Sequence, residues 1–424
     1  MSMLLFRPQL LAASILSMAA LSSQAASVAD AAKQLSGAMA AKDQPRVDAC
    51  AREFIAALGS KAGQATEAPE FILPDEDAKA LEAEQVPGLF DRAFASLQAD
   101  AWWKSNPPGP EAPAPLRVVA SVIEGCLAAR EANTGSAEEL LKEARSAGDF
   151  LQAVQKHAGK EVFPFPAWKG KRGRYGMIAD KLMRDAEAAE KVSETIQNGW
   201  IVSDQGSGEL NLDNSLAGQA LLSLHAATKE DAYLAGARAA AQWAEKHPIV
   251  PTAHFNSYSV TLLARLAEVT GEKAPLDAAL EICRLGILPT QLREGPNAGR
   301  WASPTDAKMV YHFQNLRAIT VLLLALAQDS PDHPALEQAL RLGLKAHNET
   351  IIAQGGTSLD VTLEVYCLLL GHKEKLSALL TDTLTFDAAR MIFRAAVEEY
   401  RLEHPTISPG TWGHYLKFTA AKGK

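Results

Sequence analysis

Clusters of polar residues recur in the second half of the chain, and each opens a strongly apolar helical segment. They follow one another at intervals of roughly 40 to 55 residues, which is typical of stacked helical repeats. The clusters are Leu212-Asp213-Asn214, His254-Phe255-Asn256-Ser257-Tyr258, Tyr311-His312-Phe313-Gln314-Asn315-Leu316-Arg317 and Asp360-Val361-Thr362-Leu363-Glu364. Polar residues at matching ends of stacked helices converge on one face, where a pocket can form. The pattern therefore predicts a site at that face.

The second and third clusters contain the residue types that acid–base chemistry needs. His254 and His312 titrate in the range that suits a general base. A phenol such as Tyr311 or Tyr258 is able to donate a proton, or to act as both base and acid if its pKa is lowered. We therefore select His254, Tyr311 and His312 as candidate catalytic residues.

Amide and guanidinium groups of the same clusters are suited to stabilising negative charge on a ligand. Asn256, Asn315 and Arg317 are the candidates for this role. Arg317 lies one turn inside an otherwise apolar segment, so it needs an anionic partner, either Glu364 or a ligand. Helix N-termini around the mouth of the pocket favour an anionic ligand further.

Each of these residues also has a purely structural interpretation. A histidine at a helix start is often a cap or a satisfied polar group, and Asp213, Asp306 and Asp360 occur where N-caps are expected. Three further candidates lie in loops that lead to the same face. They are Trp301, Trp412 and His414, which either contact a ligand or pack within the fold.

Two kinds of helix alternate in this half of the chain. Segments that follow the polar clusters, such as 319–327 and 361–370, are apolar nearly all round, as helices buried on every side are. Segments between them, such as 231–246 and 334–347, have charged faces and apolar stripes. Inner and outer helices in alternation predict an all-α fold, an incomplete (α/α) toroid of helical hairpins.

The remainder of the chain divides into three further parts. Residues 1–26 resemble a signal peptide, with Arg7, an apolar core over 10–21 and small residues before a cleavage site. Residues 27–160 predict a smaller N-terminal helical bundle, and 161–176 form a linker rich in aromatic and basic residues. The toroid is expected over residues 177–424. We expect a periplasmic or secreted protein that is not inserted in a membrane after signal removal.

Composition narrows the range of partners. The chain has 42 Lys plus Arg against 50 Asp plus Glu, and an acidic balance disfavours nucleic acid as a partner. The cysteines Cys50, Cys126, Cys283 and Cys367 all lie in apolar helical contexts, which favours buried free thiols over disulfides. No Cys-x-x-Cys or His-rich spacing occurs, so we predict no metal and no cofactor.

Several segments resemble α/α-toroid carbohydrate-active proteins, which include polysaccharide lyases, six-hairpin glycosidases and sugar epimerases. The resemblance rests on Asn198-Gly199-Trp200, Leu212-Asp213-Asn214, 221–228 and 233–243, and it covers roughly residues 175–415. The clusters at His254 and Tyr311 are similar to the Asn-Asn-His and Tyr-His-Asn-Tyr motifs of alginate-lyase-like enzymes. Here, however, His254 precedes Asn256, and Phe313-Gln314 interrupts the second motif.

The resemblance implies an oligo- or polysaccharide as partner. For an anionic polysaccharide, it implies cleavage of the acidic glycan by β-elimination. Two alternatives remain open. A glycoside hydrolase would use two carboxylic acids from among Asp213, Asp306, Asp360 and Glu364. A non-catalytic scaffold would bind a glycan or a protein and would scatter the polar clusters over exposed helix faces.

Overall fold

The structure is a computed structural model, and parts of the chain are described in it. The described residues are 27–64, 90–91, 94–96, 98–99, 101–105, 109, 112–168, 173–304, 308–353, 364–365, 368–369, 372, 376, 413 and 416. The predicted signal peptide, residues 1–26, lies outside them.

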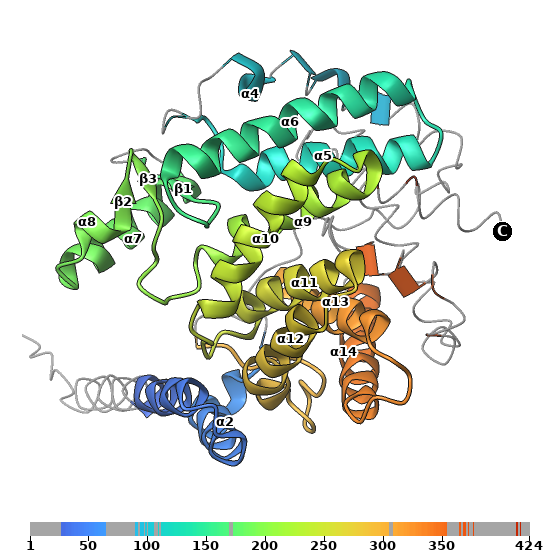
Figure 1. The fold of residues 1–424 in the computed structure, drawn as a ribbon. Helices are drawn as coiled ribbons and strands as arrows, with labels where there is room; N and C mark the ends of the chain where they lie inside the picture. Colours follow the sequence, from blue (N-terminus) through green and yellow to red (C-terminus); the bar gives the residue numbers. More distant parts are fainter. Residues whose placement is uncertain are drawn as a thin grey trace, which may run out of the picture.

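Paired antiparallel helices in two layers build the main body (Figure 1). The pairs are α5 (Leu116–Glu131) with α6 (Ala137–Ala158), α9 (Asn211–Thr228) with α10 (Asp231–Lys246), α11 (Ala253–Thr270) with α12 (Lys273–Gly286), and α13 (Met309–Ala325) with α14 (His333–Ala353). Helices α5, α9, α11 and α13 contact one another in that order and form the inner layer. The predicted all-α fold, an incomplete toroid of helical hairpins, is confirmed.

The inner and outer helices differ as the sequence predicts. Inner helix α11 buries residues on all its faces, including the polar His254, Asn256 and Ser257 of its first turns. Outer helix α10 buries one stripe of small residues with Tyr233 and leaves its charged face in solvent. A helix that contacts neighbours on every side has to be apolar all round, whereas an outer helix needs one apolar stripe.

Residues near the C-terminus continue the inner layer on both of its sides. Glu364 forms an ion pair with Arg317 of α13. Gly413 lies close against Gly125 and Ala128 of α5, where a β-carbon would collide with them. One apolar core runs through these contacts from Phe90 to Leu416.

Helices α5 and α6 lie before residue 160, where the sequence predicts the end of the N-terminal bundle, and both contact helices of the toroid. The sequence assigns both helices to an N-terminal bundle, because their alanine-rich segments precede the aromatic linker. In the structure α5 packs against α9 as an inner helix, and α6 packs outside it as an outer helix. The apolar core is therefore continuous across residues 160 and 161.

A second, smaller core holds the first helices of the described chain. Residues 27–40 are helical and are followed by α2 (Gln44–Leu58) and the short η1 (Gly59–Lys61). Their apolar side chains pack around Phe54 and meet Leu285 and Ala302 of the toroid. Figure 1 shows α2 beside the end of α12, and α2 packs against the loop between α12 and α13. That loop contains η2 (Leu288–Thr290).

The segment between α6 and α9 contains α7 (Arg174–Ala188), α8 (Val192–Thr195) and a small antiparallel sheet. The sheet has the order β1-β3-β2, with β1 (Phe165–Pro166), β2 (Ile196–Gln197) and β3 (Trp200–Ile201). The sequence analysis does not foresee this sheet, whose strands are each two residues long. Asn198 and Gly199 both have positive φ, and Asn-Gly is the preferred pair for a tight hairpin turn.

The aromatic residues of the predicted linker join the units together. Phe163, Phe165 and Trp168 are buried, and Trp168 Nε1 donates to the Ala112 carbonyl at 2.8 Å. A short helix, α4 (Trp102–Ser105), precedes α5 and places Trp102 edge-on against Phe150. The linker's basic residues 169–172 lie outside the described residues.

The described cysteines carry free thiols. Cys50, Cys126 and Cys283 are free and buried, as predicted, and Cys367 lies outside the described residues. Within the described part of the chain, no helix combines the length and apolarity needed to cross a membrane.

Candidate functional site

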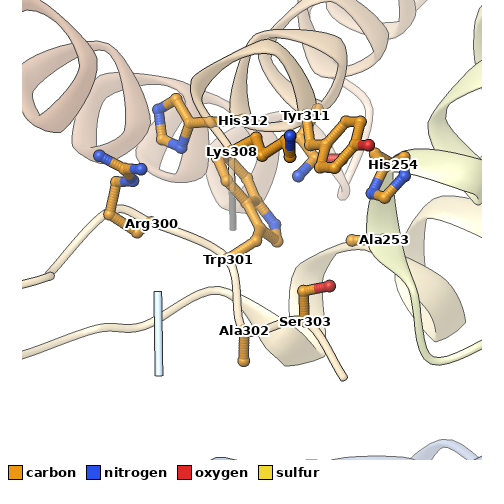
Figure 2. Close-up of a pocket in the computed structure, with 10 residues that line it drawn as sticks. Ala253, His254, Arg300, Trp301, Ala302, Ser303, Lys308, Tyr311 and His312 are labelled. Carbon is orange, nitrogen blue, oxygen red and sulfur yellow. The ribbon is translucent and has the colours of Figure 1, made fainter. Parts of the chain in front are cut away.

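A small pocket lies where the first turns of α11 and α13 meet the loop that precedes α13 (Figure 2). Its lining includes Ala253, His254, Arg300, Trp301, Ala302, Ser303, Lys308, Tyr311, His312 and Asn315. The enclosed volume is about 10 Å³, which is close to the room one water molecule needs. Ser303, Lys308 and Tyr311 are its less buried lining residues, so the pocket opens past them.

His254 and Tyr311 form one end of this pocket. Their rings stack with centroids 3.8 Å apart and an angle of 3° between the planes. Phe255 contacts the same imidazole at 4.4 Å. The two residues occupy the first turns of neighbouring inner helices, so the sequence prediction that these clusters converge is correct for this pair.

Burial sets the charge of the groups at this end. It lowers the pKa of His254 to about 3, so the imidazole is neutral over the physiological range. Tyr258 lies one turn further along α11, and burial raises the pKa of its phenol further than the nearby Arg117 and Arg317 lower it. The first two turns of α11 therefore carry a neutral imidazole that lines the pocket and a protonated phenol that lies behind the lining.

His312 and Trp301 form the other end of the pocket and are held by the backbone. His312 Nε2 donates to the Gly343 carbonyl at 2.9 Å, and its ring lies edge-on to Trp301 at 5.0 Å. Burial, then Arg300 and His347, lower the pKa of His312 well below its usual value. Trp301 Nε1 donates to the Ile287 carbonyl at 3.0 Å, and this hydrogen bond holds the indole in place where it lines the pocket. His312 Nδ1 is a buried acceptor with no partner among the described residues.

Arg317 joins three inner elements deeper in the ring. Its Nη2 donates to Gln219 Oε1 at 2.7 Å, and its Nε lies 2.7 Å from Glu364 Oε2. The second contact is an ion pair whose N–H points off the line to the oxygen. Arg317 thus has the anionic partner that the sequence predicts in Glu364.

The two candidate amides are occupied by contacts within the fold. Asn256 accepts from Val250 N at 3.1 Å and donates to Val250 O at 2.7 Å and Gly286 O at 2.9 Å. Asn315 Oδ1 accepts from Ser257 Oγ at 2.7 Å, although its side chain still lines the pocket. Asn256 therefore fixes the start of α11.

Asp213 is paired with a residue that the sequence analysis missed, Arg117. The carboxylate accepts from Arg117 Nε at 3.0 Å and from Nη2 at 2.5 Å. It also accepts from the Arg117 backbone N–H at 3.0 Å, so it caps α5 in place of Pro115, which has no side-chain donor or acceptor. Burial lowers the pKa of Arg117, but Asp213 more than offsets this, and the guanidinium stays charged.

Arg117 shows the same pattern as the recognised clusters. It follows Pro115 and Leu116 at the start of an apolar inner helix, as His254 and Tyr311 do in theirs. Because the sequence assigns 27–160 to the N-terminal bundle, Arg117 is not among the predicted site residues.

Several predicted residues are not placed by the structure. Trp412, His414, Asp306 and Asp360 lie outside the described residues. Among the described residues, no group of three His, Cys, Asp or Glu side chains is arranged to hold a metal ion.

Comparisons with known proteins give structural neighbours alone. No family model matches the chain, and no curated protein matches it. A glycosyl hydrolase family 88 protein from Bacteroides vulgatus is similar in structure, with a TM-score of 0.49 and 9% identity over 81% of this chain and 99% of that one. A polysaccharide lyase is similar with a TM-score of 0.48 and 11% identity, over 80% of this chain and 97% of that one. Neither likeness assigns a role to a residue of this chain.

Proposed function

We propose that the protein is a carbohydrate-active enzyme that cleaves an acidic polysaccharide by β-elimination. The observation that carries this proposal is the neutral His254 imidazole stacked on Tyr311, with the protonated Tyr258 phenol one turn along the same helix. Elimination next to a uronate carboxylate needs a base for the carbon-bound proton and an acid for the leaving oxygen. This pair of groups supplies both.

His254 is assigned the role of base. It is unprotonated at neutral pH, so it is ready to accept a proton. A buried imidazole with a low pKa is a weak base, but an anionic substrate beside it stabilises the imidazolium and raises its pKa. In the step, the C–H bond breaks, a C=C bond forms, and the proton passes to His254.

Tyr258 is assigned the role of acid. Burial keeps its phenol protonated, and no hydrogen bond joins its hydroxyl to another described residue. As the C–O bond to the leaving sugar breaks, Tyr258 donates its proton to that oxygen. Tyr311 holds the plane of His254 and lines the more open side of the pocket.

Substrate binding requires the pocket to widen. A sugar ring is much larger than a single water molecule, so part of the wall has to move. Ser303 and Lys308 lie on the less buried side of the pocket, and Trp301 is buried. We therefore expect displacement on the Ser303 and Lys308 side.

The hydrolase alternative has less support from the described residues. A two-acid mechanism needs carboxyl groups that are free to exchange protons. Asp213 is committed to Arg117, and Glu364 is committed to Arg317. Both acids therefore neutralise arginines.

The experiment is incubation of the full chain with alginate, polygalacturonate and glycosaminoglycans. Absorbance of the unsaturated product reports elimination, and a reducing-sugar assay reports any cleavage. We expect both signals to rise together on one of the polymers. Reducing ends without absorbance would identify a hydrolase, and binding without either signal would identify a scaffold; each result would overturn the proposal.

A further inference from the structure

We propose that a groove beside Trp243 is a second binding site for sugar units of a glycan, separate from the His254 pocket. This inference goes beyond the proposed function, because holding a sugar there requires no cleavage. The groove is lined by residues of α10, the end of α6 and the segment around the small sheet, which Figure 1 shows beside the end of α6. Its volume of about 890 Å³ is in the range of small-molecule sites in proteins.

Trp243 supplies an aromatic surface to this groove. Its indole is half-buried on α10 and lines the groove. The indole packs against the imidazole of His247, with ring centroids 4.6 Å apart and planes 39° from parallel. No described residue accepts a hydrogen bond from the indole N–H. Such a tryptophan suits a pyranose ring, whose C–H bonds stack on the indole while a hydroxyl accepts from its nitrogen.

The imidazole of His247 is itself held in place. Its Nε2 lies 2.8 Å from Asp204 Oδ1, and its Nδ1 lies 3.1 Å from the Pro248 carbonyl oxygen. Asp204 is buried and also accepts from the backbone N–H groups of Gly206 and Leu210, each at 3.0 Å. These contacts fix the ring against which the indole packs, so little side-chain freedom is lost when a sugar binds.

Gln155 adds a fixed polar group to the lining. Its side chain is 8% exposed, and its Nε2 donates to the Glu161 carbonyl at 2.7 Å and to the Gly236 carbonyl at 3.2 Å. No described residue donates to its amide oxygen. A largely buried amide that is held through its nitrogen offers that oxygen as an acceptor for a sugar hydroxyl.

The charges of the groove balance. Its lining contains two lysines and two glutamates, which are Lys156, Lys160, Glu161 and Glu194. Their formal charges sum to zero. Such a lining favours the uncharged hydroxyl groups of a sugar over a strongly charged ligand, which needs a surface of the opposite sign.

The groove and the His254 pocket lie on the same face of the ring. The hairpins are antiparallel, so the ends of outer helices α6 and α10 lie on the side where the inner helices begin. Residues 247–252 lead from the end of α10 to the start of α11, where His254 lies. A glycan held at Trp243 is therefore able to continue across this face toward the pocket. Two linked contacts hold a long chain more tightly than either contact alone.

The test measures binding of soluble oligosaccharides of cellulose, mannan, alginate and polygalacturonate by calorimetry. It uses full-length His254→Phe as the parent, so that no ligand is consumed. At least one oligosaccharide is expected to bind, and Trp243→Ala should raise its Kd about tenfold or more, because the stacking surface is lost. The Kd should differ little between low and high salt, since hydroxyl groups carry the recognition.

Trp102→Ala in the same parent is the matched control. Trp102 is also a half-buried tryptophan packed against a ring, that of Phe150, and it does not line the groove. Its substitution should leave the Kd unchanged. Circular dichroism of each variant checks that the fold is retained.

The outcomes separate this inference from the proposed function. Binding that is weakened in Trp243→Ala and kept in Trp102→Ala supports the site, whether or not the chain cleaves any polymer. Equal affinity in Trp243→Ala and its parent, equal losses in the two tryptophan variants, loss of binding at high salt, or no binding of any oligosaccharide would overturn it. If Trp243→Ala does not fold, Gln197→Ala replaces it, because Gln197 is a half-buried lining residue, and a severalfold rise in Kd is expected.

Discussion

His254 and Tyr311 lie face to face across two neighbouring inner helices, with ring centroids 3.8 Å apart and planes 3° from parallel. The stack places an imidazole with no hydrogen bond to another described residue at the open side of the pocket. Stacking fixes the plane of the imidazole and leaves its nitrogens available. Tyr311 therefore orients the ring and His254 supplies the base, so substitutions of the two residues should have different effects on activity.

We predict that His254→Phe abolishes most of the activity while the fold is retained. Phenylalanine preserves a flat ring against Tyr311 but removes the base, so kcat should fall by about 10²- to 10⁴-fold. Tyr258→Phe should cause a loss of similar size, because it removes the proposed proton donor. Tyr311→Phe keeps the stack and should cost less than either. The control is His157→Ala on the exposed end of α6, and kinetics on the cleaved polymer provide the measurement.

A loss in Tyr311→Phe as large as that in His254→Phe would contradict this ranking. It would transfer the proton-donor role from Tyr258 to Tyr311. Circular dichroism of each variant separates loss of chemistry from loss of fold.

The buried histidines predict a loss of stability in mild acid. His254 and His312 have pKa values lowered in the folded state, to about 3 for His254, so the unfolded chain binds more protons below its usual histidine pKa of about 6.5. Their contribution is therefore constant above about pH 6.5 and falls as the pH drops toward 3. A histidine that stays neutral in the folded state but is protonated in the unfolded state lowers the free energy of unfolding at about pH 5. The loss is about 2 kcal/mol relative to neutral pH.

Urea unfolding near pH 7 and near pH 5 measures this effect. His254→Phe should show a pH dependence that is smaller by about 2 kcal/mol, because the proton it would take up on unfolding is gone. Equal pH dependence in His254→Phe and the wild type would show that His254 is not held neutral by burial.

The architecture was predictable from the sequence because it depends on periodicity. Helices that are apolar all round, such as α13, alternate with amphipathic helices such as α14, and this alternation is a property of single segments. The pairing of α5 with α9 depends instead on contacts between distant residues. No periodicity reports those contacts, and the aromatic and basic segment 161–176 resembled a boundary after α6.

The candidate site was predictable in part. The clusters at His254 and Tyr311 do meet, because both open inner helices at the same end of the ring. The Asn256 amide donates to the backbone carbonyls of Val250 and Gly286. The sequence did not distinguish such a structural amide from one that binds a ligand. It also did not show that Asp213 pairs with Arg117, since hydrogen-bond partners depend on tertiary packing.

The Arg117 and Asp213 pair predicts strong coupling in stability. Asp213→Asn leaves a largely buried guanidinium without its counter-ion, and Arg117→Gln leaves a fully buried carboxylate alone. Each single variant should lose about 3 to 5 kcal/mol. The double variant should lose less than the sum of the two, because neither charge remains unpaired. A double-mutant cycle from urea unfolding measures the coupling, and additive losses would show that the pair does not act as a unit.

Gly286 packs closely against Asn256. We therefore predict that the methyl group added by Gly286→Ala disturbs the His254 site, which Gly286 does not line. A β-carbon at Gly286 would overlap the Asn256 amide and Ile249, so Gly286→Ala has to displace Asn256 from its bonds to the Val250 backbone. We expect a loss of about 1 to 3 kcal/mol in unfolding free energy. Because Asn256 lies two residues beyond His254 in the first turns of α11, the shift should also lower kcat.

Gly37→Ala provides the matched control for that substitution. Gly37 is exposed within the helix of residues 27–40, and a β-carbon there meets nothing within 4 Å. Alanine is the better helix former, so this variant should gain about 0.5 to 1 kcal/mol with unchanged kinetics. Urea unfolding and kinetics on both variants check the pair of expectations. If Gly286→Ala were as stable and as active as Gly37→Ala, the Asn256 contacts would not be what holds His254 in place.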